Sequence, residues 1–246
     1  PHRALNRDAA VIDLRARHSV RVTVPVPDPA LFTLDALAAA ATELPPEQVE
    51  HHRAVGLPML LPDGAVERAA MPVADVIRRI DDGDSWVMLV GLGALERYRA
   101  TTMQMTAPLL LAARAAGETP VAVDLVAFVA SDGARVPFHC DTGHHLLLQL
   151  EGTKTVAVGW YDDPDVEHAM LLDSVGRGRA NPSRAPDRVD EVVLAPGEAL
   201  ALPAFCFHGV TESKGRSVAL TALVRTDVTR ATADRLDAES RASAAS

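Results

Sequence analysis

The sequence contains few lysines, cysteines and aromatic residues, and it lacks a long apolar run. Two lysines, Lys154 and Lys214, occur among 246 residues, and the formal net charge is −9. A nucleic-acid-binding surface needs a basic face, so we expect no nucleic-acid partner. No apolar run approaches the roughly 20 residues of a membrane helix, and no secretory signal opens the chain. Two cysteines, Cys140 and Cys206, are too few for a disulfide framework, which predicts reduced, packed thiols in a cytoplasmic protein.

Apolar residues make up 48% of the chain, enough for a sizeable core in a single domain. Residues 1–120 read as an α/β region, with strands at 20–24 and 86–92 and helices at 33–43, 45–47, 72–80 and 103–116. From residue 121 the period changes, and strand-like segments lie at 121–130, 146–150, 155–160, 192–194, 199–202 and 217–224. Strands joined by short turns predict a barrel or sandwich as the core, 121–225, followed by a C-terminal helix or tail, 226–246.

A long segment, 161–192, interrupts the strands of the core. Such an insertion is either a functional lid or an irregular excursion. If it forms a lid, Arg177 and Arg179 are candidates to bind an acidic substrate; otherwise they belong to a solvated face. The histidines His51, His52 and His168 have no chemical partners nearby in sequence, and we expect them at the surface.

Three residues have the composition of a metal site. His139 and Asp141 are two apart, so in a strand both side chains can converge on one point. His208 follows an apolar segment that would end at the mouth of a barrel. Two imidazoles and one carboxylate form the set that holds non-haem Fe(II) and leaves coordination positions open. Alone, each histidine is more often a hydrogen-bonded core residue; together they predict a metal centre.

The same stretch resembles the JmjC/cupin-like Fe(II)- and 2-oxoglutarate-dependent oxygenases, the group that includes the asparaginyl hydroxylase of hypoxia-inducible factor. The family pattern has a proline before His-x-Asp, a strand, a Gln-x-x-Gly-x-Lys hairpin and a Pro-Gly-acid strand leading to the distal histidine. The matching residues are Pro137, His139, Asp141, Gln149, Gly152, Lys154, Pro196, Gly197, Glu198, Leu200, Leu202, Pro203 and His208. The resemblance covers 121–224 and implies a mainly β fold, a double-stranded β-helix of cupin or jelly-roll type, with flanking helices.

The resemblance also implies roles for residues and cofactors. His139, Asp141 and His208 would bind Fe(II), and Lys154 would bind the distal carboxylate of 2-oxoglutarate, with O2 as the second cosubstrate. The charges of iron, Asp141, 2-oxoglutarate and Lys154 cancel, so an apolar barrel need not bury a net charge. The sequence departs from the pattern at Val136, where the hypoxia-factor hydroxylase has a cosubstrate-binding threonine.

A hydroxyl from another strand would have to replace that threonine, and Thr221, Ser217 and Tyr98 are the candidates. His145, which follows the first two ligands, is a candidate substrate residue or a polar residue at a strand start.

The sequence therefore predicts an oxygenase that hydroxylates an unactivated C–H of an amino acid, a peptide or a small natural product, with a homodimer left open. Two alternatives remain: a cupin-type metalloenzyme that does not use 2-oxoglutarate, and a non-catalytic cupin-like binding or regulatory domain.

Overall fold

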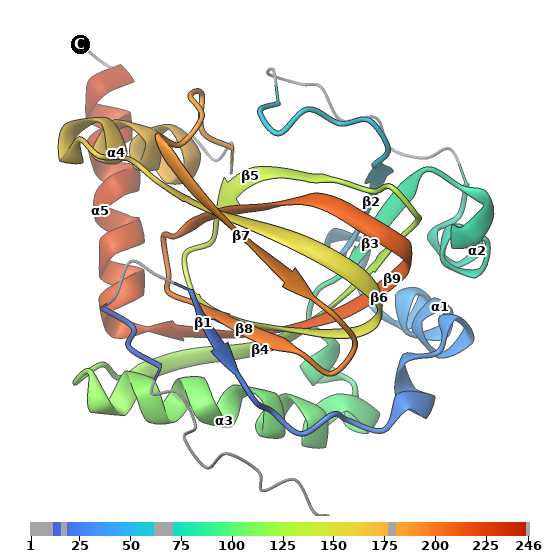
Figure 1. The fold of residues 1–246 in the computed structure, drawn as a ribbon. Helices are drawn as coiled ribbons and strands as arrows, with labels where there is room; N and C mark the ends of the chain where they lie inside the picture. The colour runs from blue at the N-terminus through green and yellow to red at the C-terminus, as the bar shows by residue number, and fades with distance from the viewer. Residues whose placement is uncertain (1–11, 16–18, 62–70, 177–180, 245–246) are drawn as a thin grey trace, which may run out of the picture.

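The structure is a computed structural model that describes residues 12–15, 19–61, 71–176 and 181–244 (Figure 1). Its strands form one connected, mostly antiparallel sheet in the order β1-β8-β6-β9-β4-β3-β2, with β5 paired to β9 and β7 paired to β6. The strands are β1 Val20–Val22, β2 Val49–Arg53, β3 Ser85–Leu89, β4 Pro120–Ala130, β5 Val136–Cys140, β6 His144–Trp160, β7 Arg188–Leu194, β8 Ala199–Leu202 and β9 Phe207–Thr226.

Two long bent strands, β6 and β9, form the centre of the sheet. They pair from His144 opposite Val224 to Gly159 opposite Phe207. The first part of β6 also pairs with β8, and its second part pairs with β7; β9 pairs with β5 near its start and with β4 near its end. Because both strands pass through both halves of the sheet, the sheet curves round on itself (Figure 1). This confirms the predicted double-stranded β-helix with flanking helices.

The hairpin that the family pattern implies at Gln149, Gly152 and Lys154 is wrong. β6 continues through this point as one strand, with register shifts against β9 on both sides of Glu151. Gly152 has φ +71°, and a Cβ there would lie 2.2 Å from the carbonyl oxygen of Arg216. Only glycine fits such a left-handed, crowded position, so the glycine marks a bulge and a bend instead of a chain reversal.

Helices α1, α2 and α3 cover the outer face of the sheet and enclose the main hydrophobic core. Helix α1 begins after Thr33, whose hydroxyl accepts a hydrogen bond from the Ala36 amide. Apolar residues of the outer sheet face, such as Leu125 and Leu220, pack with helix residues such as Leu37 and Met105. The α-helices are α1 Leu34–Glu43, α2 Val73–Arg78, α3 Arg99–Ala115, α4 Pro164–Leu171 and α5 Asp227–Ala244, and the short 3-10 helices are Pro29–Phe32, Pro46–Gln48, Ile80–Asp82, Leu92–Ala94 and Glu96–Tyr98.

The N-terminal region contributes strands to the sheet as well as helices. β1 pairs with β8 at one edge, while β2 and β3 extend the other edge beyond β4. The prediction of a surface position is therefore wrong for His52, which lies on β2. Its ring is 4.6 Å from that of Trp86, and 15% of its side chain is exposed.

The segment 161–192 is largely ordered structure where the structure describes it. It contains α4, a π-helical turn at Leu172–Gly176 and the first residues of β7. Apolar residues of α4 and the π-turn pack against Tyr161 and Phe207, and the π-turn contacts α5. Arg177 and Arg179 lie outside the described residues. In the part of the chain that the structure describes, no helix combines the length and apolar character needed to cross a bilayer.

Candidate metal centre

A second buried cluster lines part of the inside of the β-helix and identifies its inner face. Leu200 lies opposite Leu147, and both pack with Val156 and Val158 in this cluster. Residues two apart share a face of a strand, so every other residue along these strands points inward. His208 lies opposite Val158 and therefore faces the interior.

The sheet register brings the two predicted histidine ligands together. His139 on β5 lies directly opposite His208 on β9, and their ring centroids are 4.2 Å apart. Asp141 comes just after the end of β5, with a carboxylate oxygen 3.9 Å from Nε2 of His208. One donor atom from each of the three residues lies within 4.8 Å of the others. The side chains are thus close enough to share one ion.

The hydrogen bonds of both histidines leave the same nitrogen free. Nδ1 of His139 donates to the carbonyl of Pro137 (2.9 Å), and Nδ1 of His208 donates to the carbonyl of Cys206 (3.0 Å). A carbonyl can only accept, so the proton sits on Nδ1 and the lone pair on Nε2. Fixing the tautomer through the second ring nitrogen is how metal-binding histidines are oriented in proteins. The donor set therefore fits a divalent metal.

The charges at this position also suit a cation. Desolvation would raise the pKa of Asp141, but the nearby imidazoles of His139, His145 and His208 and the Arg225 guanidinium lower it. Desolvation, together with the neighbouring imidazoles, lowers the pKa of His208 well below its ordinary value. At neutral pH Asp141 is consequently ionised and His208 is neutral, the protonation states in which these two groups bind metal.

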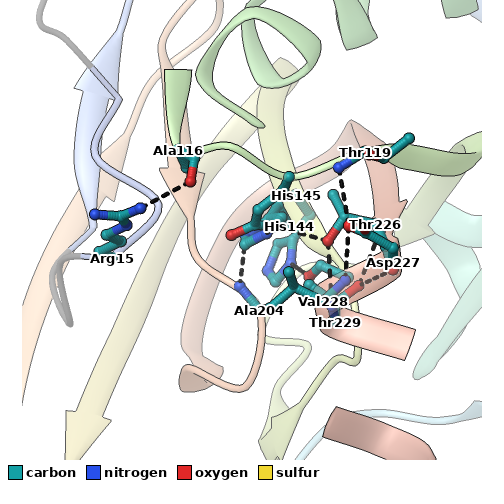
Figure 2. Close-up of polar contacts among 12 residues, drawn as sticks. Arg15, Ala116, Thr119, His144, His145, Ala204, Thr226, Asp227, Val228 and Thr229 are labelled. Carbon is teal, nitrogen blue, oxygen red and sulfur yellow. Dashed lines mark hydrogen bonds and ion pairs between the residues drawn. The ribbon is translucent and has the colours of Figure 1, made fainter. Parts of the chain in front are cut away.

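The loop before His208 is anchored by a buried polar cluster (Figure 2). His144 accepts a hydrogen bond at Nδ1 from the Ala204 amide (3.0 Å) and donates from Nε2 to Glu118 (3.1 Å). Thr226 donates to the same carboxylate at 2.6 Å. The next residue in the loop, Phe205, has φ 62° and donates its amide to the carbonyl of Asp141. The cluster thereby ties the loop before the distal histidine to β6 and to the carboxylate ligand.

Lys154 lies in the same interior without an anionic partner. Its side chain is 2% exposed, and its Nζ is 4.5 Å from the ring centroid of Phe128 on β4. Within the described residues it forms no hydrogen bond and no ion pair. Desolvation lowers its pKa from 10.5 to about 8. A buried cation without a counter-charge is costly, so the site is suited to a bound anion.

The hydroxyls predicted to help hold the cosubstrate have different surroundings. Tyr98 lies in the core between the sheet and the helices and donates its hydroxyl to the Leu31 carbonyl, so its prediction as a cosubstrate residue is wrong. Ser217 is fully buried and accepts from Nε2 of Gln149. Thr221 is half-buried opposite Leu147 and faces inward. The prediction missed Ser213, which lies opposite Lys154.

His145 lies beside the cluster of His139, Asp141 and His208 as a buried third imidazole. Its ring centroid is 4.7 Å from that of His208, and Nδ1 donates to the Gly143 carbonyl. Desolvation lowers its pKa, so the ring is neutral, with its lone pair on Nε2. That nitrogen is buried and has no hydrogen-bond partner among the described residues.

Both cysteines are free thiols near residues of the candidate metal cluster in the sequence, with Cys140 buried and Cys206 partly exposed. Burial raises the pKa of Cys140 and of Cys206 to about 12, so both remain protonated at neutral pH. Cys140 packs with Tyr161 and Phe207 beneath α4. Protonated, buried thiols act as small apolar groups, in keeping with a packing role.

No protein-family model and no curated protein matches the sequence. Among solved structures, that of Escherichia coli YcfD is 15% identical, with a TM-score of 0.54, and the match covers 87% of this chain and 50% of that one. Two further structures also match. One is YcfD described as a ribosomal oxygenase, with 17% identity and a TM-score of 0.49; the match covers 84% of this chain and 48% of that one. The other is YcfD with cobalt and 2-oxoglutarate, with 16% identity, a TM-score of 0.48 and the same coverage. The chain spans about half the length of these structures, and the likeness establishes the fold.

Proposed function

We propose that the protein is an Fe(II)- and 2-oxoglutarate-dependent oxygenase that hydroxylates an unactivated C–H bond. One observation carries the proposal: the buried Lys154, which has no ion-pair partner among the described residues, shares the barrel interior with the cluster of His139, Asp141 and His208. The cluster accounts for the metal. The lysine accounts for an anionic cosubstrate, which a metal site alone does not require.

The three residues of the cluster would bind the ion, and hydrogen bonds would orient the two histidines. Nε2 of His139, Nε2 of His208 and the Asp141 carboxylate would hold the ion, while their Nδ1 hydrogen bonds keep both rings in place. Three protein ligands leave room for the cosubstrate and O2. Iron with 2-oxoglutarate supplies the oxidising chemistry, and the apolar inner face around it excludes water.

Lys154 would bind the far carboxylate of 2-oxoglutarate and thereby fix its orientation. Nothing else in the described interior neutralises its charge. With the dianion and the metal in place, the charges of the site cancel, and the desolvation penalty on the ammonium is offset. Phe128 forms an apolar and weakly attractive surface beneath the ammonium.

The substrate is proposed to be an amino acid, a peptide-like chain or a small natural product. The unpartnered Nε2 of His145 beside the metal ligands supports a role in accepting a hydrogen bond from a substrate donor. A cytoplasmic setting, in which Cys140 and Cys206 stay reduced, belongs to the same proposal.

The direct test of the activity is a reaction with Fe(II), 2-oxoglutarate and O2, in which candidate amino acids, peptides and metabolites are screened by mass. We expect O2-dependent succinate and a product 16 Da heavier, both lost in His139→Ala. His168→Ala is the matched control, because that histidine lies on α4 and pairs with Glu239. Unchanged succinate formation in His139→Ala, or none in the wild type with any substrate, would contradict the proposal.

A further inference from the structure

A buried carboxylate needs more hydrogen-bond donors than Lys154 alone provides. It has two oxygens with about four acceptor positions, and buried polar groups are almost always hydrogen-bonded. The resembling family places a hydroxyl at the position occupied here by Val136. Val136 lies opposite Val210, so this point of the inner face is apolar. Another donor must therefore come from a different strand.

The register of β6 and β9 puts Ser213 directly opposite Lys154. Residues opposite one another in an antiparallel pair share a face, with Cβ atoms about 5 Å apart. The flanking residues confirm which face this is. Glu212 and Lys214 form a largely exposed ion pair at 3.1 Å, so they point outward and Ser213 points inward with Lys154.

Ser213 is also buried with an unused hydroxyl. The residue is 2% exposed, and its backbone carbonyl accepts from the Gly133 amide at 2.9 Å. Its Oγ forms no hydrogen bond within the described part of the chain. A serine hydroxyl that makes no such bond still has its O–H to donate, so Ser213 can donate to a ligand bound beside Lys154.

The other hydroxyls on the inner face fit less well. Ser217 lies opposite Ala130 on β4, while Lys154 lies opposite Ser213, and the Ser217 Oγ accepts a hydrogen bond from Nε2 of Gln149. Thr221 is half-buried and lies opposite Leu147, toward the part of β6 that contains His145. Ser213 is the hydroxyl that is both buried and directly paired with Lys154.

We propose that Ser213 is the second residue that binds the distal carboxylate of 2-oxoglutarate, donating to one oxygen while Lys154 donates to the other. The inference rests on the proposed function, because it assumes this cosubstrate. The Ser213 hydroxyl, on β9, would take the place of the hydroxyl that is missing at Val136. It also makes β6 and β9, which carry Lys154 and His208, two sides of one cosubstrate pocket.

The test measures cosubstrate binding to the full chain with Fe(II) under anaerobic conditions, through the visible absorption band that forms on chelation. In Ser213→Ala the dissociation constant for 2-oxoglutarate should rise by about tenfold or more, as expected for a lost hydrogen bond to a charged group. The constant for 2-oxopentanoate, which has a methyl group in place of the distal carboxylate, should stay the same. Ser217→Ala and Thr221→Ala are matched controls and should change 2-oxoglutarate binding less.

Three results would overturn the inference. Equal 2-oxoglutarate affinity in Ser213→Ala and wild type would remove Ser213 while leaving the proposed function intact. An equal loss for both ligands would show a general effect on the pocket or the metal. A larger effect from Thr221→Ala would assign the role to Thr221. Absence of the band in the wild type would instead contradict the proposed function itself, and the inference with it.

Discussion

The pH dependence of 2-oxoglutarate binding tests the role of Lys154 in a way that follows from its burial. Desolvation lowers the pKa of Lys154 to about 8, and no described carboxylate counters this. A bound carboxylate would favour the charged ammonium and raise that pKa. Binding must then be coupled to proton uptake near and above pH 8.

The size of the effect follows from the protonated fraction of the free protein. With a pKa near 8, that fraction falls from about nine-tenths at pH 7 to about one-tenth at pH 9. If the bound form stays charged, the affinity should fall about tenfold between these values, or about 1.4 kcal/mol. Below pH 7 this contribution should level off.

The assay is titration calorimetry with Fe(II) and 2-oxoglutarate under anaerobic conditions at several pH values. Buffers of different ionisation enthalpy should report uptake of about half a proton at pH 8. Lys154→Met removes the titrating group while keeping an unbranched apolar chain, so its weak binding should lose this pH dependence. An affinity that is constant from pH 7 to 9 in the wild type would refute the reasoning.

Three further predictions concern stability. Lys154→Met should stabilise the metal-free protein at pH 7 by about 3 kcal/mol, because the Lys154 amine binds its proton more tightly in the unfolded chain than in the folded one. The wild type should gain the same stability as the pH rises from 8 to 10.5. Urea unfolding measures both changes. Gly152→Ala should lower the free energy of unfolding by much more than Gly215→Ala does. Both glycines have φ near +70°, but of the two only a Cβ at residue 152 would meet a carbonyl oxygen, at 2.2 Å. His144→Ala should cost about 3 kcal/mol by leaving buried groups unpaired, and should weaken Fe(II) binding in an iron titration; unchanged iron affinity would argue against positioning of the loop.

The sequence predicted the β-rich core and the members of the metal cluster because their signals are local. Alternating apolar residues located β4 and β8, and the His-x-Asp spacing placed His139 beside Asp141 at the end of one strand. The distal His208 could be associated with them because it follows the apolar strand that the family pattern leads to. In each case the information lies within a few neighbouring residues.

Features that depend on register were not predictable in the same way. Ser213 faces Lys154 only because β9 carries an extra residue near Thr211, which shifts the pairing between Val210 and Glu212. One unrecognised bulge reverses the predicted inward and outward positions beyond it.

Long-range packing accounts for the remaining errors. Tyr98 was a cosubstrate candidate by residue type, and its place between the helices and the sheet depends on how α3 packs on the sheet. His52 joins the core because β2 pairs with β3, which the neighbouring prolines conceal in the sequence. The sequence does not distinguish the bend at Gly152 from a turn, because a left-handed glycine occurs in both.

The central claim is that one barrel interior binds Fe(II) through His139, Asp141 and His208 and 2-oxoglutarate through Lys154. Anaerobic titration of the protein with Fe(II) and then 2-oxoglutarate, followed by visible absorption, tests both halves at once. The account predicts a metal-to-ligand absorption band in the wild type that is absent in His139→Ala and needs far more 2-oxoglutarate in Lys154→Met. No band in the wild type, or the same titration curve in Lys154→Met, would contradict it.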